Sequence, residues 1–461
     1  MRLSRLKRQL GDAAGSRLAL RRGVQAFPAN GELWRKLAEM AKAQGDVEGA
    51  RRHYAREVSG HPKPPAAFDA WARLEMGQGR RSRAAEIAKA GLSVVKEKEA
   101  RSRLWHAYAL ALVDEGERLE ALTAGVGEDS ESAYLNHALG IELSKNESCR
   151  TVARTHLLKA AVAKQPEATL SLARLEEMEG RENEARLAYR AATAERSATI
   201  AAWRSWARFE ESRGQLENAR GVYREASVRF PRDAELHVQW ARLEPRVDYA
   251  RQVLHAGLRS SSAAEHPRLY HALGDLEATA ARRTETKQLG PLHAARRAFY
   301  RGAKAANNRK DLVNLVHSWA YCEWAIAQRR GMSKAGMSRV RRLFAWASKL
   351  ARDDLARLSF ILVSRAGFEA AAGDFNAAKR FALFSVRQAE SDHPTKAKAW
   401  TILSKLATSD SLKAKAANNA RVHDYQALQA FDSTDPTRHA LKRQWTKPPP
   451  PLEDRYGCFG D

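Results

Sequence analysis

The chain has 461 residues and carries 79 lysines and arginines against 54 acidic residues, which gives a formal net charge of +25. So strong a positive charge indicates a polyanionic partner. The three cysteines, Cys149, Cys322 and Cys458, lack metal-site spacing, which argues against a cysteine-based zinc site and is typical of a reducing compartment. No apolar run approaches the length of a transmembrane helix, so the sequence predicts no membrane span.

The N-terminal segment, residues 1–17, is basic. Met1 to Leu10 contains no acidic residue, a composition that transit peptides share. However, Leu18, Arg21 and Gly23 already follow the pattern of a helix that recurs along the chain, which leaves hardly any room for a cleavable presequence. We therefore interpret residues 1–17 as a short basic segment at the start of an array whose first helix is missing.

Between residues 18 and 430 one sequence motif recurs about eleven times, at a spacing of about 34 residues. A fixed period of this length predicts stacked helix–turn–helix units, because one pair of helices cannot bury its apolar face alone. We predict an all-α fold, an α–α superhelix of about eleven repeats. Each first helix is marked by a large residue followed, in most units, by a small one: Leu37-Ala38, Trp71-Ala72, Tyr108-Ala109, His137-Ala138, Leu172-Ala173, Trp206-Ala207, Trp240-Ala241, Leu273-Gly274, Trp319-Ala320, Arg365-Ala366 and Leu403-Ser404.

The residues at particular positions of the repeat support a helix–turn–helix unit. Trp203 and Trp206 are three residues apart and share one helix face, so we expect them to be buried between units together with Tyr223 and Trp240. Prolines such as Pro28, Pro62, Pro166, Pro231 and Pro394 are expected to end a second helix or open the next unit. Glycines stand where the first helix must stop, and we expect the left-handed turn conformation at Gly45, Gly79, Gly180, Gly214 and Gly373.

The residue pattern of the repeat resembles that of the HAT (half-a-TPR) repeat family. First helices read WARFE at Trp206 to Glu210 and WARLE at Trp71 to Glu75 and at Trp240 to Glu244, and second helices carry the spacing of Ala50-Arg51-Tyr54. The resemblance implies a role in RNA processing. Within the family the array is most similar to organellar, chloroplast-type mRNA maturation and stabilisation factors, which implies the organelle stroma. Nuclear relatives act in splicing, 3′-end and rRNA processing, so the nucleus is the alternative compartment.

Arginines recur at one register of the first helix, two residues after its second large residue. By analogy with tetratricopeptide repeats we assign this register to the concave face, where a column of guanidinium groups could follow a phosphodiester backbone. The alternative is a solvated face on which Glu177 and Glu211 pair with arginines one turn away, although Arg242 has no such downstream acid. The candidate RNA-binding residues, including two on the neighbouring stripe, are Arg35, Arg73, Arg174, Arg204, Arg208, Arg242 and Lys405.

A second basic region lies between Glu323 and Asp353 and contains no acidic residue. It is either a solvated basic surface or a secondary phosphate-binding patch, since such runs are common non-specific footprints of nucleic-acid binding. The residues of this candidate patch are Arg329, Arg330, Lys334, Arg339, Arg341 and Arg342.

Catalytic motifs are missing from the sequence. It contains neither a phosphate-binding glycine loop nor an H-E-x-x-H zinc motif. The glutamates Glu75, Glu176, Glu210, Glu244, Glu277 and Glu323 recur with the repeat, which favours packing or ion pairing over acid catalysis. We predict no enzymatic activity, no catalytic residue, no metal and no cofactor.

The C-terminal segment, residues 431–461, leaves the repeat pattern. Pro448 to Pro451 favour an extended chain and cannot continue a helix. We interpret the segment as a flexible proline-rich tail; a docking peptide anchored by Trp445, Tyr456 and Phe459 is the alternative.

Together these features predict a helical-repeat protein that binds single-stranded RNA along its inner face. Such a protein would act in mRNA maturation and protect RNA from exonucleases without chemistry of its own. The alternative is a protein–protein scaffold that collects other proteins of an RNA-processing complex. A basic concave groove would favour RNA, and an acidic one would favour the scaffold.

Overall fold

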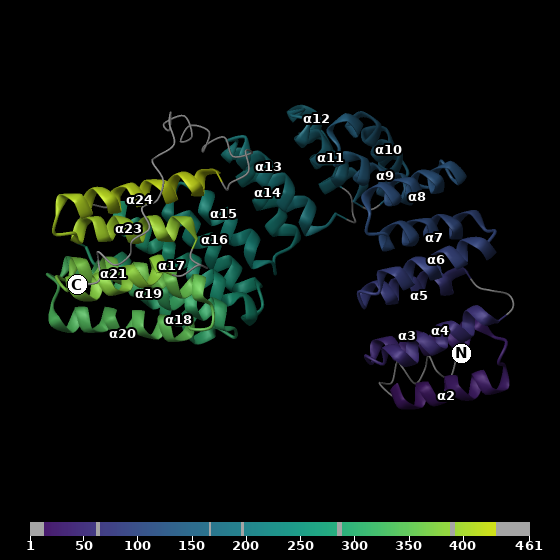
Figure 1. Cartoon of the computed structure of the whole chain (residues 1–461), viewed down its shortest axis with the longest axis horizontal. Helices are drawn as coiled ribbons and strands as arrows, with labels where there is room; N and C mark the ends of the chain where they lie inside the picture. Colours follow the sequence, from purple (N-terminus) through teal and green to yellow (C-terminus); the bar gives the residue numbers. More distant parts are fainter. Residues whose placement is uncertain are drawn as a thin grey trace. The chain divides into compact units, whose positions relative to one another are not determined.

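The structure, a computed structural model, describes residues 13–60, 65–165, 167–194, 198–283, 288–387 and 392–429. Within these ranges the chain is all-α, as predicted, and no strand is present. It divides into two compact units, unit 1 (Met1–Ala202) and unit 2 (Trp203–Asp461), which are described separately below (Figure 1). The predicted tail, Pro62 and Pro166 lie outside the described residues, and the predicted limits of the repeat region at 18 and 430 stay predictions.

Unit 1 is built from helices that pack in chain order as antiparallel pairs, for example α3 with α4 and α9 with α10. First helices also contact the next first helix, as α5 does α7 and α7 does α9. The helices are α2 (Ala13–Ala26), α3 (Gly31–Ala43), α4 (Val47–Ser59), α5 (Pro65–Gly77), α6 (Arg81–Val94), α7 (Lys98–Ala111), α8 (Glu115–Glu128), α9 (Ala133–Ser144), η1 (Glu147–Cys149), α10 (Arg150–Val162), α11 (Ala168–Met178) and α12 (Glu182–Ala194).

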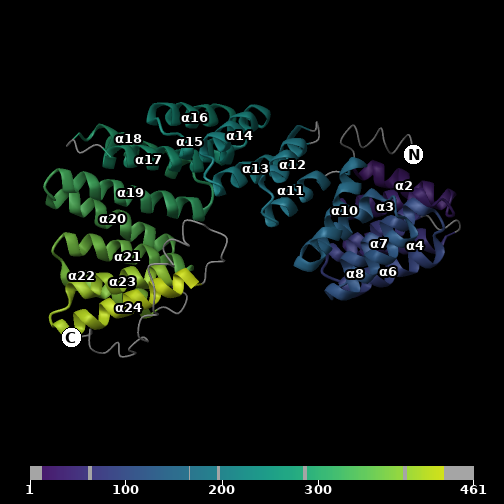
Figure 2. The same cartoon turned by 90° about the horizontal axis from the view of Figure 1, so that it is seen from above.

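Unit 2 repeats this arrangement with longer helices. Figure 2 shows the pairs α17/α18, α19/α20, α21/α22 and α23/α24 stacked in sequence order. The helices are α13 (Ile200–Ser212), which begins just before the unit boundary, α14 (Leu216–Arg229), α15 (Ala234–Leu243), α16 (Val247–Ser260), η2 (Ala263–Glu265), α17 (His266–Arg283), α18 (Gly290–Ala305), α19 (Arg309–Arg329), α20 (Lys334–Leu350), α21 (Leu355–Ala371), α22 (Phe375–Arg387), α23 (His393–Leu406) and α24 (Asp410–Gln429).

Glycine makes the turn inside the hairpins, as the sequence predicts. Each of the five predicted glycines follows a first helix and has a positive φ. Glycine adopts this conformation without steric strain because it has no Cβ atom. The φ values are +77° at Gly45, +73° at Gly79, +71° at Gly180, +72° at Gly214 and +85° at Gly373.

The aromatic residues of the most regular repeat are buried to different degrees. Trp203 and Tyr223 are buried as predicted, with 6% and 2% of their surface exposed. Trp206 and Trp240 are only partly buried, so the prediction of a fully buried quartet is wrong for these two. The indole N–H of Trp206 nevertheless donates to the buried carboxylate of Glu210 at 3.1 Å.

Four of the recurring glutamates, Glu75, Glu176, Glu277 and Glu323, are buried and pair with an arginine of the preceding second helix, which confirms the packing or ion-pairing interpretation for these residues. Glu75 accepts from Arg51, on the preceding second helix, at 2.7 and 2.8 Å, and from the Trp71 indole at 3.1 Å. A buried carboxylate needs such partners because it has lost its hydration. The same bridge from a second helix to the next first helix joins Arg118 to Glu142, Arg154 to Glu176, Arg251 to Glu277, Arg296 to Glu323 and Arg341 to Glu369.

Close approach of two helices at Gly274 gives a first test of the packing. A Cβ atom at this position would meet the Phe299 ring at 2.4–2.6 Å. Gly274→Ala should therefore destabilise unit 2 by about 1–3 kcal/mol in urea denaturation. Gly221→Ala is the matched control, since nothing lies within 4 Å of its Cβ position on α14, and it should stabilise by about 0.5–1 kcal/mol. Equal effects of the two substitutions would contradict the helix packing.

Candidate binding surfaces

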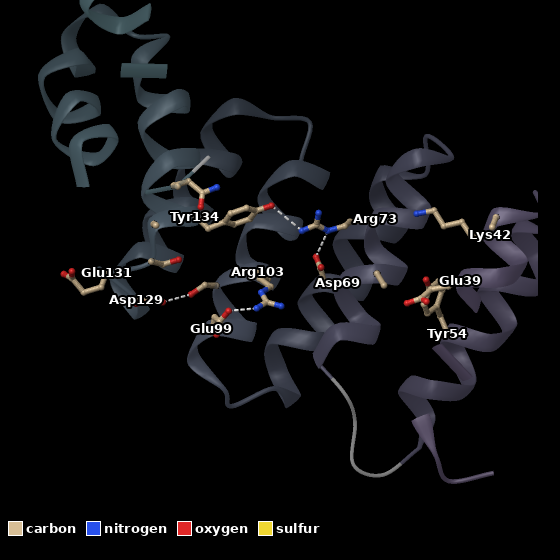
Figure 3. A pocket seen from close by; sticks show the side chains of 16 residues that line it. Glu39, Lys42, Tyr54, Asp69, Arg73, Glu99, Arg103, Asp129, Glu131 and Tyr134 are labelled. Atoms are coloured by element: carbon tan, nitrogen blue, oxygen red, sulfur yellow. Dashed lines mark hydrogen bonds and ion pairs between the residues drawn. The ribbon is translucent and has the colours of Figure 1, made fainter. Parts of the chain in front are cut away.

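The first helices of unit 1 line a hollow of about 1110 Å³ (Figure 3). Its walls come mainly from α3, α5, α7 and α9, so the first helices form the inner face of this unit. Five acidic side chains line it against three basic ones: Glu39, Asp69, Glu99, Asp129 and Glu131 against Lys42, Arg73 and Arg103. The inner face of unit 1 is therefore not the continuous basic groove that an RNA backbone would favour.

Arg73, the predicted RNA-binding residue of this hollow, is engaged by its neighbours. Its Nε donates to Asp69 at 2.8 Å and its Nη2 to the Tyr134 hydroxyl at 3.4 Å, as Figure 3 shows. Burial by itself would lower the pKa of Arg73, but these hydrogen bonds raise it overall, so the guanidinium stays charged. Arg103 pairs in the same way with Glu99 on its own helix.

Arg242 lines the corresponding hollow of unit 2, which has a volume of about 950 Å³ and walls from α15, α17 and α19. Its Nη2 pairs with Glu211 at 2.5 Å, and Glu211 also accepts from the Tyr223 hydroxyl at 2.7 Å. Arg242 has no downstream acid on its own helix, as the sequence indicates, but it is paired nonetheless. Its partner comes from the preceding first helix, α13, rather than from the next turn of its own helix.

The other predicted residues of the arginine register differ in their surroundings. Arg208 is exposed and forms no ion pair with any residue that the structure describes, while Arg204 is held by both oxygens of Asp233 at 2.6–2.7 Å. Arg174 lies in unit 1 with Arg73, whereas Arg208, Arg242 and Lys405 lie in unit 2. Arg35 is partly buried and Lys405 is exposed. RNA binding by this register stays a prediction.

Three residues of the predicted basic patch belong to the packing of unit 2. Arg329 donates to the carbonyl oxygens of Gln288 and Ala281 at 2.6 and 2.5 Å. Arg341 donates to Glu369, and Arg339 reaches Glu323 at 3.5 Å. These three are therefore less available to a ligand than the sequence suggested. The remaining three, Arg330, Lys334 and Arg342, are exposed.

A larger basic surface comes from the second helices α18, α20 and α22. They carry four, five and three lysines or arginines and no acidic residue. We define the basic face as their exposed cations at one repeating register, none of which forms an ion pair within the described ranges: Arg297, Arg301, Lys304, Arg342, Lys349, Arg380 and Arg387. This surface is not visible as a run in the sequence, because acid-containing first helices separate its three helices along the chain.

A serine, a histidine and an aspartate also meet in unit 2. Ser318 Oγ lies 2.9 Å from His271 Nε2, and His271 Nδ1 lies 3.3 Å from Asp275. The same serine–histidine contact joins neighbouring first helices twice more, His137 to Ser171 and His317 to Ser364, at 2.9 and 3.0 Å. Because it recurs with the repeat, we assign it to helix packing rather than to nucleophilic catalysis. Among the described residues there is no cluster of three or more metal-ligating groups and no helix suited to cross a membrane.

Comparison with known proteins finds one repeat model and several solved structures of low sequence identity. Residues 200–243 match the sequence model of the tetratricopeptide repeat. The chain is similar to yeast Tom70 (11% identity, 96% of this chain and 98% of that chain, TM-score 0.39) and to human IFIT1, solved as a dimer with PPP-AAAA (13%, 84% and 89%, 0.35). It is also similar to a tetratricopeptide repeat protein from Parabacteroides merdae (15%, 63% and 98%, 0.31). No curated protein sequence matches the chain significantly.

The paired helices, the glycine turns and the matched repeat define the class: the chain is an all-α helical-repeat protein with a TPR-like arrangement of helices. Stacked repeats of this kind form extended concave surfaces that can bind a partner.

Proposed function

We propose that the protein binds RNA and acts, without catalysis, in RNA processing or stabilisation. The observation that carries the proposal is the basic face of unit 2, where three second helices present cations and no acid. Unpaired lysines and arginines attract a phosphodiester backbone by releasing its counterions. The proposal moves the main RNA contact from the inner face, where Arg73 and Arg242 already pair with acids, to the outer face.

The basic face is suited to this partner because its charge is not neutralised. Arg297, Arg342 and Arg380 occupy the same register of three successive second helices and are all exposed. Because α18, α20 and α22 are the second helices of successive stacked pairs, these side chains recur once per pair along the stack. A strand laid across the stack would meet one or more cations on each helix.

A protein-scaffold function is the second candidate, and the hollow of unit 1 favours it. Its five acidic lining residues outnumber three basic ones, which suits a basic protein segment better than RNA. The two functions are compatible, since one unit could hold RNA while the other holds a protein of the same processing complex. Location in the organelle stroma, or alternatively in the nucleus, is part of the proposal and rests on the HAT resemblance.

Charge substitution tests the proposal. Replacing Arg297, Arg342 and Arg380 together by glutamine should weaken RNA binding by up to about 100-fold at 0.1 M salt. The slope of log affinity against log salt should fall by up to about 2, because each phosphate contact to a single strand contributes about 0.7. Fluorescence anisotropy with labelled RNA over a salt series measures both quantities.

Two further variants make the test specific. Glutamine at Arg52, Arg56 and Lys89, which are exposed on second helices of unit 1, removes the same charge and should leave the slope unchanged. Glutamine at Arg174, Arg208 and Arg242 tests the inner face. If only this inner-face variant loses RNA, the predicted groove is the site and the outer face is not. If the wild-type chain binds no RNA, the scaffold function replaces the proposal.

A further inference from the structure

Two aromatic rings stand exposed in the basic face. Trp346 on α20 and Phe384 on α22 keep 40% and 36% of their surface exposed. Neither ring contacts another aromatic ring within the part of the chain that the structure describes. Leaving part of a large ring in water forgoes the free energy of burying it, so the exposed part of each ring is available to a partner that would cover it.

These rings occupy one register that repeats between helices. Trp346 lies between Arg342, four residues before it, and Lys349, three residues after it. Phe384 lies in the same way between Arg380 and Arg387. Residues at such spacings share one face of a helix, so each helix presents a ring flanked by two cations. On α18 the same register holds Arg301, with Tyr300 beside it, and both are exposed.

We infer that the basic face binds single-stranded nucleic acid with bases stacked on Trp346 and Phe384 while the flanking cations hold the phosphates. This inference rests on the proposed function and adds how the bases of the strand are held. A base has a flat aromatic face that a ring or a guanidinium plane can cover, and only an unpaired strand offers that face to a protein. On α18, Arg301 supplies the guanidinium plane in place of the ring.

Other partners fit this surface less well. A duplex keeps its bases stacked inside, so the two rings would stay uncovered. A membrane surface would need a continuous apolar stripe along each helix, whereas each ring here is bounded on both sides by a cation. An acidic protein segment would pair with the cations but has no general reason to cover two rings in a fixed register.

The test separates stacking from charge. The full-length chain is titrated with fluorescein-labelled oligo(A), and with the same strand annealed to oligo(U). Replacing Trp346 and Phe384 together by alanine should weaken oligo(A) binding about tenfold per ring, with duplex affinity and the salt slope unchanged. Phe375→Ala is the matched control: this ring is 59% exposed on α22 but lies outside the register, so binding should stay at the wild-type level.

The outcomes are distinct. If the double variant binds oligo(A) like the wild-type chain, while the glutamine variant of Arg297, Arg342 and Arg380 loses affinity, the stacking inference is overturned and the proposed function stands. Equal losses on the single strand and the duplex also overturn it. So does binding to phosphatidylserine vesicles that the double variant loses, with RNA affinity unchanged. Thermal unfolding of the double variant at the wild-type temperature verifies that the fold is intact.

Discussion

Replacement of Arg296 by methionine is expected to destabilise the helices around α18 and α19 by about 3 kcal/mol, the low end of the cost of breaking a buried ion pair, because the Trp319 indole and Arg339 still reach Glu323. Arg296 donates from two nitrogens to Glu323, one of these bonds measuring 2.7 Å, and Glu323 is 3% exposed. Methionine fills much of the same space, so the main loss is the partner of a buried carboxylate. Hydrogen exchange of the amides of α18 and α19, followed by mass spectrometry, measures the change in the free energy of opening.

The neighbouring arginine supplies the control. Arg297→Met removes the same charge from the same turn of α18, but Arg297 is exposed and unpaired within the described residues, so its effect should stay within about 0.5 kcal/mol. The double variant Arg296→Met with Glu323→Leu should recover part of the loss, because no buried charge then remains. Equal effects of the two single substitutions would mean that Glu323 does not depend on this bridge.

Much of this fold could be predicted from the sequence because its signals are local. The five turn glycines stand next to the helices that they end, so position and conformation were both predictable. The pairing of glutamates such as Glu75 was predictable from their recurrence with the repeat. Its partner Arg51 also recurs, which links the two halves of the motif across neighbouring units.

The binding surfaces were less predictable because they depend on contacts between distant residues. Arg242 and Glu211 are 31 residues apart, so no pattern within one helix reveals the pair. The basic face collects residues from alternate helices, and a window along the sequence mixes them with the acids of the intervening first helices. An alignment of the second helices alone places Arg297, Arg342 and Arg380 at the same position.

A buried acid in unit 1 leads to a prediction of pH dependence. Glu57 on α4 is 1% exposed, and neither of its carboxylate oxygens has a hydrogen-bond partner among the described residues. Burial raises the pKa of Glu57 from 4.5 to about 7; nearby Arg35 opposes the shift and Glu39 adds to it. Between pH 4.5 and about pH 7, the carboxyl group of Glu57 is therefore protonated in the folded chain and ionised in the unfolded chain.

The sign of the effect follows from this difference in pKa. The stability that Glu57 contributes is fully present below its unfolded pKa, falls by about 1.4 kcal/mol per pH unit as the pH rises toward 7, and is then lost. Glu57→Gln keeps the neutral form at every pH. The variant should match the wild-type chain near pH 4.5 and be more stable by about 2–3 kcal/mol at pH 8.

Hydrogen exchange of the α3–α4 amides at a series of pH values measures this difference, with each variant compared to the wild-type chain at the same pH. Glu120→Gln is the control, since Glu120 is exposed on α8 and forms no ion pair within the described residues; its difference should stay within about 0.5 kcal/mol throughout. A Glu57→Gln variant whose advantage does not grow between pH 4.5 and pH 8 would mean that Glu57 is ionised in the folded chain. Its charge would then have to be balanced, and Arg35, the nearby cation that lowers the pKa of Glu57, is the group placed to do so.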